Sequence, residues 1–115
     1  MTPNQKPTPT EHQIQCEILA ALSLRYGNTS KFWRNNTGAT KTQAGGFVRF
    51  GQVGSPDIMG IFGPLGRFVA IEVKTAKGKL SPAQETWLHE SKLLGAIAGV
   101  CRSIEEALAL IEGAK

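Results

Sequence analysis

The sequence predicts one α/β domain in which helices flank a mixed central sheet of about four or five strands. Three stretches carry helix signals, near the start of the chain, after Leu80 and near the end. Short apolar runs separated by glycine-rich turns lie between them, a pattern typical of strands. Interspersed helices and strands indicate an α/β domain, and 115 residues suffice for one compact domain but not for two.

The first helix is expected to begin after Thr10, a residue type that caps helix N-termini through its hydroxyl. It should end at Gly27. The polar residues 1–9 contain three prolines, so a disordered N-terminal tail is expected, with the folded domain over residues 10–115. The apolar residues at helical spacing are Ile14, Ile18, Leu19 and Leu22.

Strands dominate the middle of the chain. We expect short strands at residues 32–35 and 47–50, with a glycine- and threonine-rich loop over residues 36–46. Two longer apolar runs, 57–62 and 67–74, are separated by Gly-Pro-Leu-Gly. Four residues is a common hairpin loop length, so these runs predict a β-hairpin.

The C-terminal third predicts a helix, a strand and a helix. Ser81-Pro82 is typical of a helix start and Gly95 of a helix end. Residues 96–101 read as a strand, and Ser103-Ile-Glu-Glu is a capping box that opens a last helix ending near residue 113.

Composition excludes several classes of protein. No run reaches the ~18 apolar residues of a membrane span, and the N-terminus lacks the apolar region of a signal peptide. We therefore expect a cytoplasmic protein, in which Cys16 and Cys101 are small core residues. Phe32 and Trp33 are also expected in the core rather than as base-stacking platforms.

Asp57, Glu72 and Lys74 place charges in the predicted hairpin, where core residues are usual. If the strands pair symmetrically about the loop, Asp57 lies opposite Glu72, with Cβ atoms about 4.5–5.5 Å apart. Lys74 projects from the same face as Glu72, because side chains two apart in a strand point together. A bulge would shift this register. The alternative is a structural Glu–Lys pair with Asp57 serving only as a turn residue.

Two facing carboxylates destabilise a sheet unless a proton or a cation lies between them. Hard oxygen donors beside one ammonium group suit Mg²⁺ (or Mn²⁺), which keeps several waters. Such an ion lowers the pKa of a bound water and withdraws charge from a phosphoryl oxygen. Lys74 can orient the water or stabilise transition-state charge, so the pattern predicts phosphodiester hydrolysis.

Positive charge is concentrated in the middle of the chain. The net charge is +4, and residues 31–79 hold eight Lys or Arg against two acidic residues. Such clustering favours a phosphate backbone, although a solvated basic face is the alternative. Asn, Thr and glycine amides can also contact phosphates without reading sequence. The residues expected to face DNA are Arg34, Asn35, Asn36, Thr37, Lys41, Arg49, Lys77 and Lys79.

Several short motifs follow one another in a recognisable order. Pro56-Asp57 precedes Glu72-Val73-Lys74, an arrangement similar to the PD-(D/E)xK signature of restriction-endonuclease-like nucleases. The accompanying motifs are Glu11-x-x-x-Gln15, RNNTGA (34–39), VRFGQVGSPDIMG (48–60), AIEVK (70–74) and KLSPAQ (79–84). Together, over about residues 10–105, they resemble the VRR-NUC family, which includes small stand-alone phage and bacterial proteins.

The resemblance implies a restriction-endonuclease-like core and a set of site residues. Asp57 and Glu72 would bind metal, the backbone carbonyl of Val73 would be a further ligand, and Lys74 would be the catalytic lysine. Gln84 would lie at the site edge, although it also occupies a capping-box position after Ser81, and the two interpretations are compatible.

The resemblance also implies that a glutamate of the first helix completes the acidic set. Glu11 and Gln15 share a helix face with Ile18 and can point inward together, with Gln15 supporting the site. Glu17 lies on roughly the opposite face, so Glu11 is the expected ligand.

The function implied is that of a metal-dependent, structure-selective DNA endonuclease that resolves Holliday junctions as a homodimer. Flap cleavage or nicking is the enzymatic alternative. A DNA-binding module that has lost catalysis is a second alternative, disfavoured because Asp57, Glu72 and Lys74 are all present. A metal-stabilised structural domain is a third, disfavoured by the basic clustering.

Overall fold

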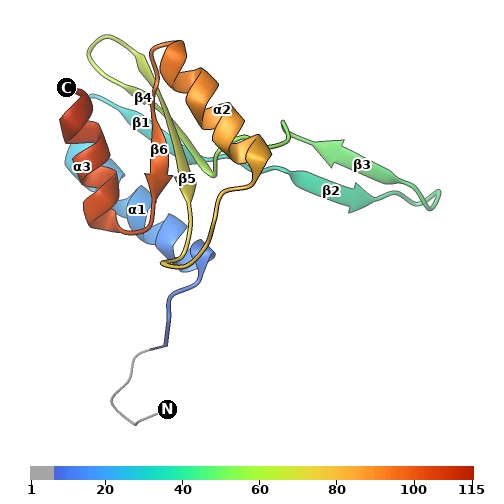
Figure 1. Ribbon diagram of the computed structural model, residues 1–115. Helices are drawn as coiled ribbons and strands as arrows, with labels where there is room; N and C mark the ends of the chain where they lie inside the picture. The colour runs from blue at the N-terminus through green and yellow to red at the C-terminus, as the bar shows by residue number, and fades with distance from the viewer. Residues whose placement is uncertain (1–6) are drawn as a thin grey trace.

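A computed structural model, which describes residues 7–115, shows a four-stranded mixed sheet with helices on both faces (Figure 1). The strand order is β1-β4-β5-β6, with β4 antiparallel to both neighbours and β5 parallel to β6. This confirms the predicted mixed sheet. Most of the tail expected over residues 1–9 lies outside the described residues. The strands are β1 (Lys31–Arg34), β4 (Ile58–Phe62), β5 (Arg67–Val73) and β6 (Ile97–Cys101).

Three helices cover the sheet. The first, α1 (Glu11–Tyr26), packs with α3 (Ile104–Ala114) on one face, and α2 (Pro82–Leu93) lies on the other. Parallel strands need a crossover connection, which α2 supplies between β5 and β6. Within residues 7–115, no helix combines the length and the apolarity needed to cross a membrane.

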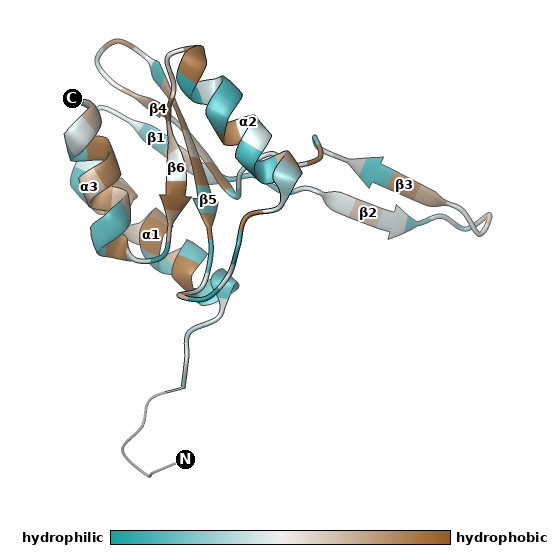
Figure 2. Cartoon of the chain, viewed as in Figure 1, coloured by the Kyte–Doolittle hydropathy of each residue, from teal (hydrophilic) through white to brown (hydrophobic). Residues whose placement is uncertain are grey.

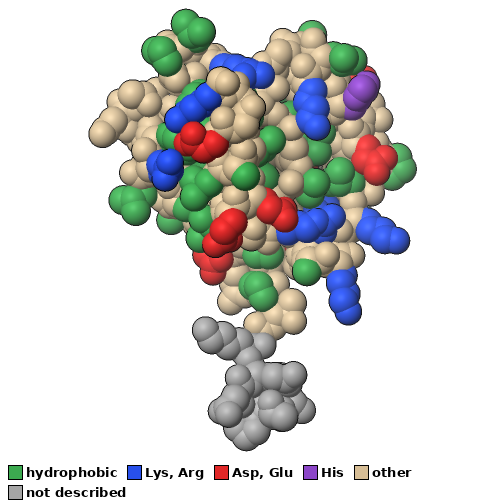
Figure 3. Space-filling model, turned by 60° about the vertical axis from the view of Figure 1, so that its left-hand side comes forward, with side chains coloured by type: hydrophobic (Ala, Val, Ile, Leu, Met, Phe, Trp, Pro, Cys, Tyr) green, Lys and Arg blue, Asp and Glu red, His purple; other side chains and the backbone are tan. Residues whose placement is uncertain are grey.

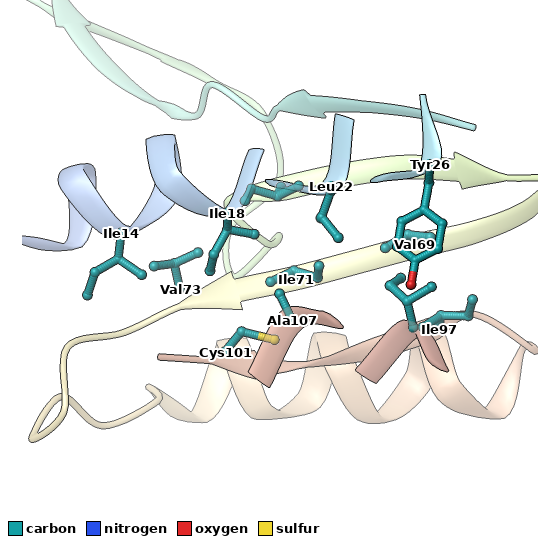
Figure 4. Packing of buried hydrophobic residues seen from close by; sticks show 12 residues of the cluster. Ile14, Ile18, Leu22, Tyr26, Val69, Ile71, Val73, Ile97, Cys101 and Ala107 are labelled. Carbon is teal, nitrogen blue, oxygen red and sulfur yellow. The ribbon is translucent and has the colours of Figure 1, made fainter. Parts of the chain in front are cut away.

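The main core lies between the sheet and the α1/α3 layer (Figure 4). Ile18 and Leu22 of α1 are fully buried against Val69, Ile71 and Val73 of β5. These β5 residues alternate along the strand, so one whole face of β5 belongs to the core. Figure 2 shows the apolar segments of α1, α3 and β6 turned into this region.

Side chains cap the helices much as the sequence predicts. Thr10 caps α1, and Ser81 caps α2 through a complete capping box with Gln84. The box predicted for α3 is only half formed. The Ser103 hydroxyl accepts from the Glu106 amide, but the Glu106 carboxylate accepts from the amide of Arg102 instead of Ser103.

The β4–β5 hairpin has the predicted register. Phe62 pairs with Arg67 and Ile58 with Ile71, so the strands are symmetric about the 63–66 loop and no bulge intervenes. The β5 strand ends at Val73, one residue before the predicted end.

Residues 36–46, predicted to be loop throughout, contain a strand. In this segment β2 (Gly38–Lys41) pairs antiparallel with β3 (Phe47–Phe50) in a separate two-stranded arm that projects from the body (Figure 1). The turn is closed by Thr42, whose amide donates to the Gly46 carbonyl at 2.8 Å and whose hydroxyl accepts from the Gly46 amide at 3.1 Å. This closure explains why a glycine- and threonine-rich stretch forms a hairpin.

Two residues predicted to be in the core are exposed. Cys101 is buried as expected, but Cys16 lies on the solvent side of α1. Trp33 is 42% exposed, while Phe32 packs against the core. Trp33 shares a sheet face with Ala70, which packs under α2. The main contacts of α2 are with β5 and β6, and Trp33 lies on the edge strand beyond them.

Candidate active site

The acidic pair forms at the end of the β4–β5 hairpin. Asp57 immediately precedes β4, and one step beyond the Ile58–Ile71 pair brings it opposite Glu72. The Asp57 carboxylate accepts a hydrogen bond from the backbone amide of Val73 at 2.8 Å through Oδ2. The hairpin register therefore fixes Asp57 beside Glu72, as the sequence predicts.

Glu72 is a buried carboxylate with one oxygen satisfied. The residue is only 2% exposed, and its Oε1 accepts from Nε2 of Gln84 at 3.1 Å. Its Oε2 is buried without a hydrogen-bond partner among the described residues. Burial, and then the adjacent Asp57 carboxyl, raise the pKa of Glu72 to about 9, while the charge of Lys74 acts in the opposite direction.

The loop that carries Asp57 is held by Asn35, just past the end of β1. The Asn35 amide N–H donates to the Asp57 carbonyl at 2.7 Å. The Asn35 side-chain amide donates to the Ser55 hydroxyl and to the Pro56 carbonyl, both at 2.9 Å. Asn35, predicted to face DNA, thus turns its side chain into the protein and positions the loop.

Lys74 follows β5 directly, where its amide donates to the Cys101 carbonyl at 3.2 Å. The backbone of Gly78 lies against its aliphatic stem, since a Cβ at Gly78 would lie 3.4 Å from Cβ and Cδ of Lys74. Nη1 of Arg102 donates to the carbonyls of Thr75 and Gly78, at 2.5 and 2.6 Å, and so holds the loop in place. No local sequence motif predicts this role of Arg102, because the parallel β5–β6 pairing is what brings it to the loop after Lys74.

Gln84 has both of its predicted roles, in the capping box of α2 and at the edge of the site. Its Oε1 accepts from the Ser81 amide at 2.9 Å, completing the capping box, while its Nε2 donates to Glu72. The start of α2 therefore fixes the orientation of a site carboxylate. Leu80 and Leu88 pack with Ala70 beneath it.

The first helix brings Glu11 and Gln15 to the same side as the core. Glu11 is half-buried and its charge contributes to the raised pKa of Glu72, whereas Glu17 is exposed. Gln15 is buried, with Oε1 unpaired among the described residues. Within residues 7–115, however, no three His, Cys, Asp or Glu side chains are grouped closely enough to hold a metal ion. Glu11 therefore does not form a three-carboxylate cluster with Asp57 and Glu72 in this conformation, and its role as a metal ligand stays a prediction.

Asp57 and Glu72 suit a divalent cation by donor type. Both are hard oxygen donors, and Glu72 has a buried oxygen that lacks a partner within the described part of the chain. A cation between them would offset both the repulsion and the burial of charge. Val73 already donates its amide to Asp57, and its carbonyl stays a predicted ligand.

Most residues predicted to face DNA are exposed. They lie at the end of β1, in the β1–β2 connection, on the arm and in the loop after Lys74. Arg67, by contrast, is tied internally, donating to the carbonyls of Gly95 and Ala114 at 2.7 Å each. Basic and acidic side chains are interspersed on the face seen in Figure 3. The exposed predicted residues are Arg34, Asn36, Thr37, Lys41, Arg49, Lys77 and Lys79.

A mixed sheet with two carboxylates and a lysine at the end of one hairpin is the arrangement that the sequence predicts for a nuclease-type α/β domain. The chain belongs to the VRR-NUC family, since the model of the VRR-NUC domain matches residues 10–105. This family is part of the restriction-endonuclease-like nuclease superfamily and supports a nuclease-type role in DNA processing.

A solved structure described as a VRR_NUC domain has a similar fold. It aligns with 90% of this chain and 97% of its own length, with a TM-score of 0.58 and 21% sequence identity. A search of curated proteins found no match.

Proposed function

We propose that the protein is a metal-dependent, structure-selective DNA endonuclease that resolves Holliday junctions as a homodimer. One observation carries the catalytic part of this proposal. Asp57 lies opposite Glu72 across the hairpin, and Lys74 is close enough for its charge to act on Glu72. Paired carboxylates that hold a metal ion, with a nearby lysine, suit metal-assisted phosphodiester hydrolysis.

The three side chains divide into two roles. Asp57 and Glu72 would hold Mg²⁺ or Mn²⁺, which supplies Lewis acidity and lowers the pKa of a coordinated water. Lys74 orients the attacking water or stabilises the negative charge that develops on the phosphoryl oxygens. The loop held by Arg102 keeps the Lys74 stem in place.

The surrounding hydrogen bonds fix these groups before substrate binds. Asp57 is held by the Val73 amide and, through its loop, by Asn35. Glu72 is held by Gln84. Outer partners of this kind orient ligands and tune metal affinity, so Asn35 and Gln84 are positioning residues in this account.

The substrate proposal rests on the resemblance to small stand-alone phage and bacterial VRR-NUC proteins. A four-way junction contains four strands, and symmetric resolution needs one cut in each of two opposite strands. A homodimer supplies two active sites for these cuts. The exposed Arg34, Lys77 and Lys79 provide charge for DNA backbones near the site.

The test incubates the purified protein with labelled four-way junction, flap and linear duplex, in Mg²⁺, Mn²⁺ or EDTA. We expect metal-dependent cleavage of the junction and its loss in Asp57→Ala and Lys74→Ala. Cleavage that persists in EDTA would contradict the metal-dependent mechanism. Preferential cutting of the flap would make the flap, and not the four-way junction, the proposed substrate. Binding without cutting in every metal would identify a DNA-binding module. A monomeric mass by light scattering with junction present would count against paired cutting.

A further inference from the structure

We infer that the β2–β3 arm is a DNA-binding ribbon that lies along the duplex beside the active site. This inference rests on the proposed function and adds the means by which the substrate is held. The arm is unpartnered within the described structure: its two strands pair with each other and project away from the sheet and helices (Figure 1). An isolated two-stranded hairpin is marginal in water, which indicates that it lies against a partner.

The charge of the arm is complementary to DNA. Residues 36–56 contain Lys41 and Arg49 but no Asp or Glu. Ala39 pairs with Arg49 and Lys41 with Phe47, so these four side chains share one face of the ribbon. That face presents two cations and an aromatic ring that is 75% exposed at Phe47.

The arm leaves the body at the end of the sheet that carries Asp57. It is inserted between β1 and β4, whose last pair at that end is Arg34–Ile58, and the Asn35 and Asp57 backbones are hydrogen-bonded just beyond. Both ends of the arm therefore start beside the acidic pair. A duplex lying along the arm passes the site where cleavage is proposed.

The base of the arm contacts α2 of the body. Gln52 Oε1 accepts from Trp87 of α2 at 3.0 Å. Gly51 and Gly54, at φ +79° and +82°, lie so close to Thr37 and Ala83 that an added Cβ would clash. The contacts with Trp87 and Ala83 place the base of the arm against the start and middle of α2, on the body that also carries Asp57.

A hollow of about 320 Å³ at this base suits a backbone phosphate. It is lined by Arg49 together with Thr37 and glycines 38, 51 and 54, and no acidic residue contributes to its lining. One guanidinium with hydroxyl and amide donors is a set that contacts phosphate without reading sequence. A two-stranded ribbon also has the width to enter a major groove.

The test measures binding of labelled four-way junction and linear duplex in EDTA, as a function of salt, for wild type and Lys41→Ala/Arg49→Ala. Two single variants serve as controls: Lys92→Ala removes one exposed cation from α2, and Thr40→Ala alters the other face of the arm without changing its charge. We expect the double variant to bind about 10-fold or more weakly and to lower the slope of log K against log[salt] by about 1.8. Both controls should bind as wild type does. A double variant that binds like Lys92→Ala overturns the inference.

The outcomes separate this inference from the proposed function. Wild-type protein that binds but never cuts refutes the nuclease and leaves the arm supported. If wild type cuts DNA and the double variant cuts it equally well, the DNA-binding role of the arm is refuted and the proposed nuclease function is not. Light scattering checks whether the double variant has dissociated into monomers. If its loss of binding is due to that dissociation, the arm is a contact between copies of the chain and the inference is wrong.

Discussion

The carboxylate of Asp57 and the amide of Val73 are joined by a 2.8 Å hydrogen bond across the β4–β5 hairpin. This bond anchors the acidic side chain to the strand that also carries Glu72. Because one hairpin supplies both carboxylates, their separation depends on a single register, and that register is set by the four-residue loop at its other end.

Asn35→Ala should destabilise the fold and reduce cleavage together. The change removes two donors to the loop that carries Asp57, leaving the buried Pro56 region with unmet acceptors. We expect the free energy of unfolding to fall by about 1–3 kcal/mol, as measured by urea denaturation. The exposed neighbour variant Asn36→Ala is the control. Equal stability of the two variants would contradict the positioning role of Asn35.

Ser81→Ala and Gln84→Ala should separate helix capping from the support of Glu72. Both variants disrupt the capping box of α2, at a cost of about 0.5–2 kcal/mol. Only Gln84→Ala also removes the donor to Glu72. We therefore expect Gln84→Ala alone to raise the Mg²⁺ concentration for half-maximal cleavage, by about 10-fold or more. An equal shift in Ser81→Ala would assign the effect to the helix instead.

Glu72 should make the stability of the metal-free protein fall with rising pH. Its pKa is raised from 4.5 to about 9, chiefly by burial and then by Asp57, so the fold favours the protonated carboxyl. The stability from this group is fully present below about pH 4.5 and is lost as pH rises through about 9. In EDTA, the unfolding midpoint of wild type should therefore fall below that of Glu72→Gln as the pH is raised.

Parallel midpoints for wild type and Glu72→Gln across this pH range would contradict the raised pKa, because the other titrating groups are shared by both proteins. Added Mg²⁺ should narrow the difference at high pH, since a bound cation favours the ionised carboxylate.

The two cysteines should react at very different rates in the native protein. Cys16 is exposed, whereas Cys101 is buried and burial raises the pKa of its thiol to about 12. Iodoacetamide should therefore modify Cys16 first, with Cys101 reacting only after denaturation. Mass spectrometry of peptides from the native protein would show this order. Modification of both thiols at one rate would be inconsistent with the packing of β6.

Local signals were sufficient to predict the hairpin and α2. The Gly-Pro-Leu-Gly loop determines the pairing of Asp57 with Glu72, and Ser81, Pro82 and Gly95 mark the ends of α2. These features depend on residues that are close together in the sequence, so they could be predicted from the sequence alone.

Features that depend on tertiary neighbours were not predictable in the same way. Arg102 reaches the Lys74 loop only because β6 pairs parallel to β5. Trp33 is exposed because α2 does not extend over the edge strand, and the β2 strand depends on the closure of its turn by Thr42. Local periodicity does not predict which strands a helix covers or which distant groups an arginine contacts.

The most direct test of the central claim is single-turnover cleavage of a labelled four-way junction by Asp57→Asn. An asparagine oxygen can still accept the Val73 hydrogen bond, so the fold and junction binding should be retained. The loss of one metal-binding carboxylate should slow Mg²⁺-dependent cleavage by at least about 100-fold. Cleavage by Asp57→Asn at the wild-type rate would contradict the assignment of Asp57 and Glu72 as the metal-binding pair.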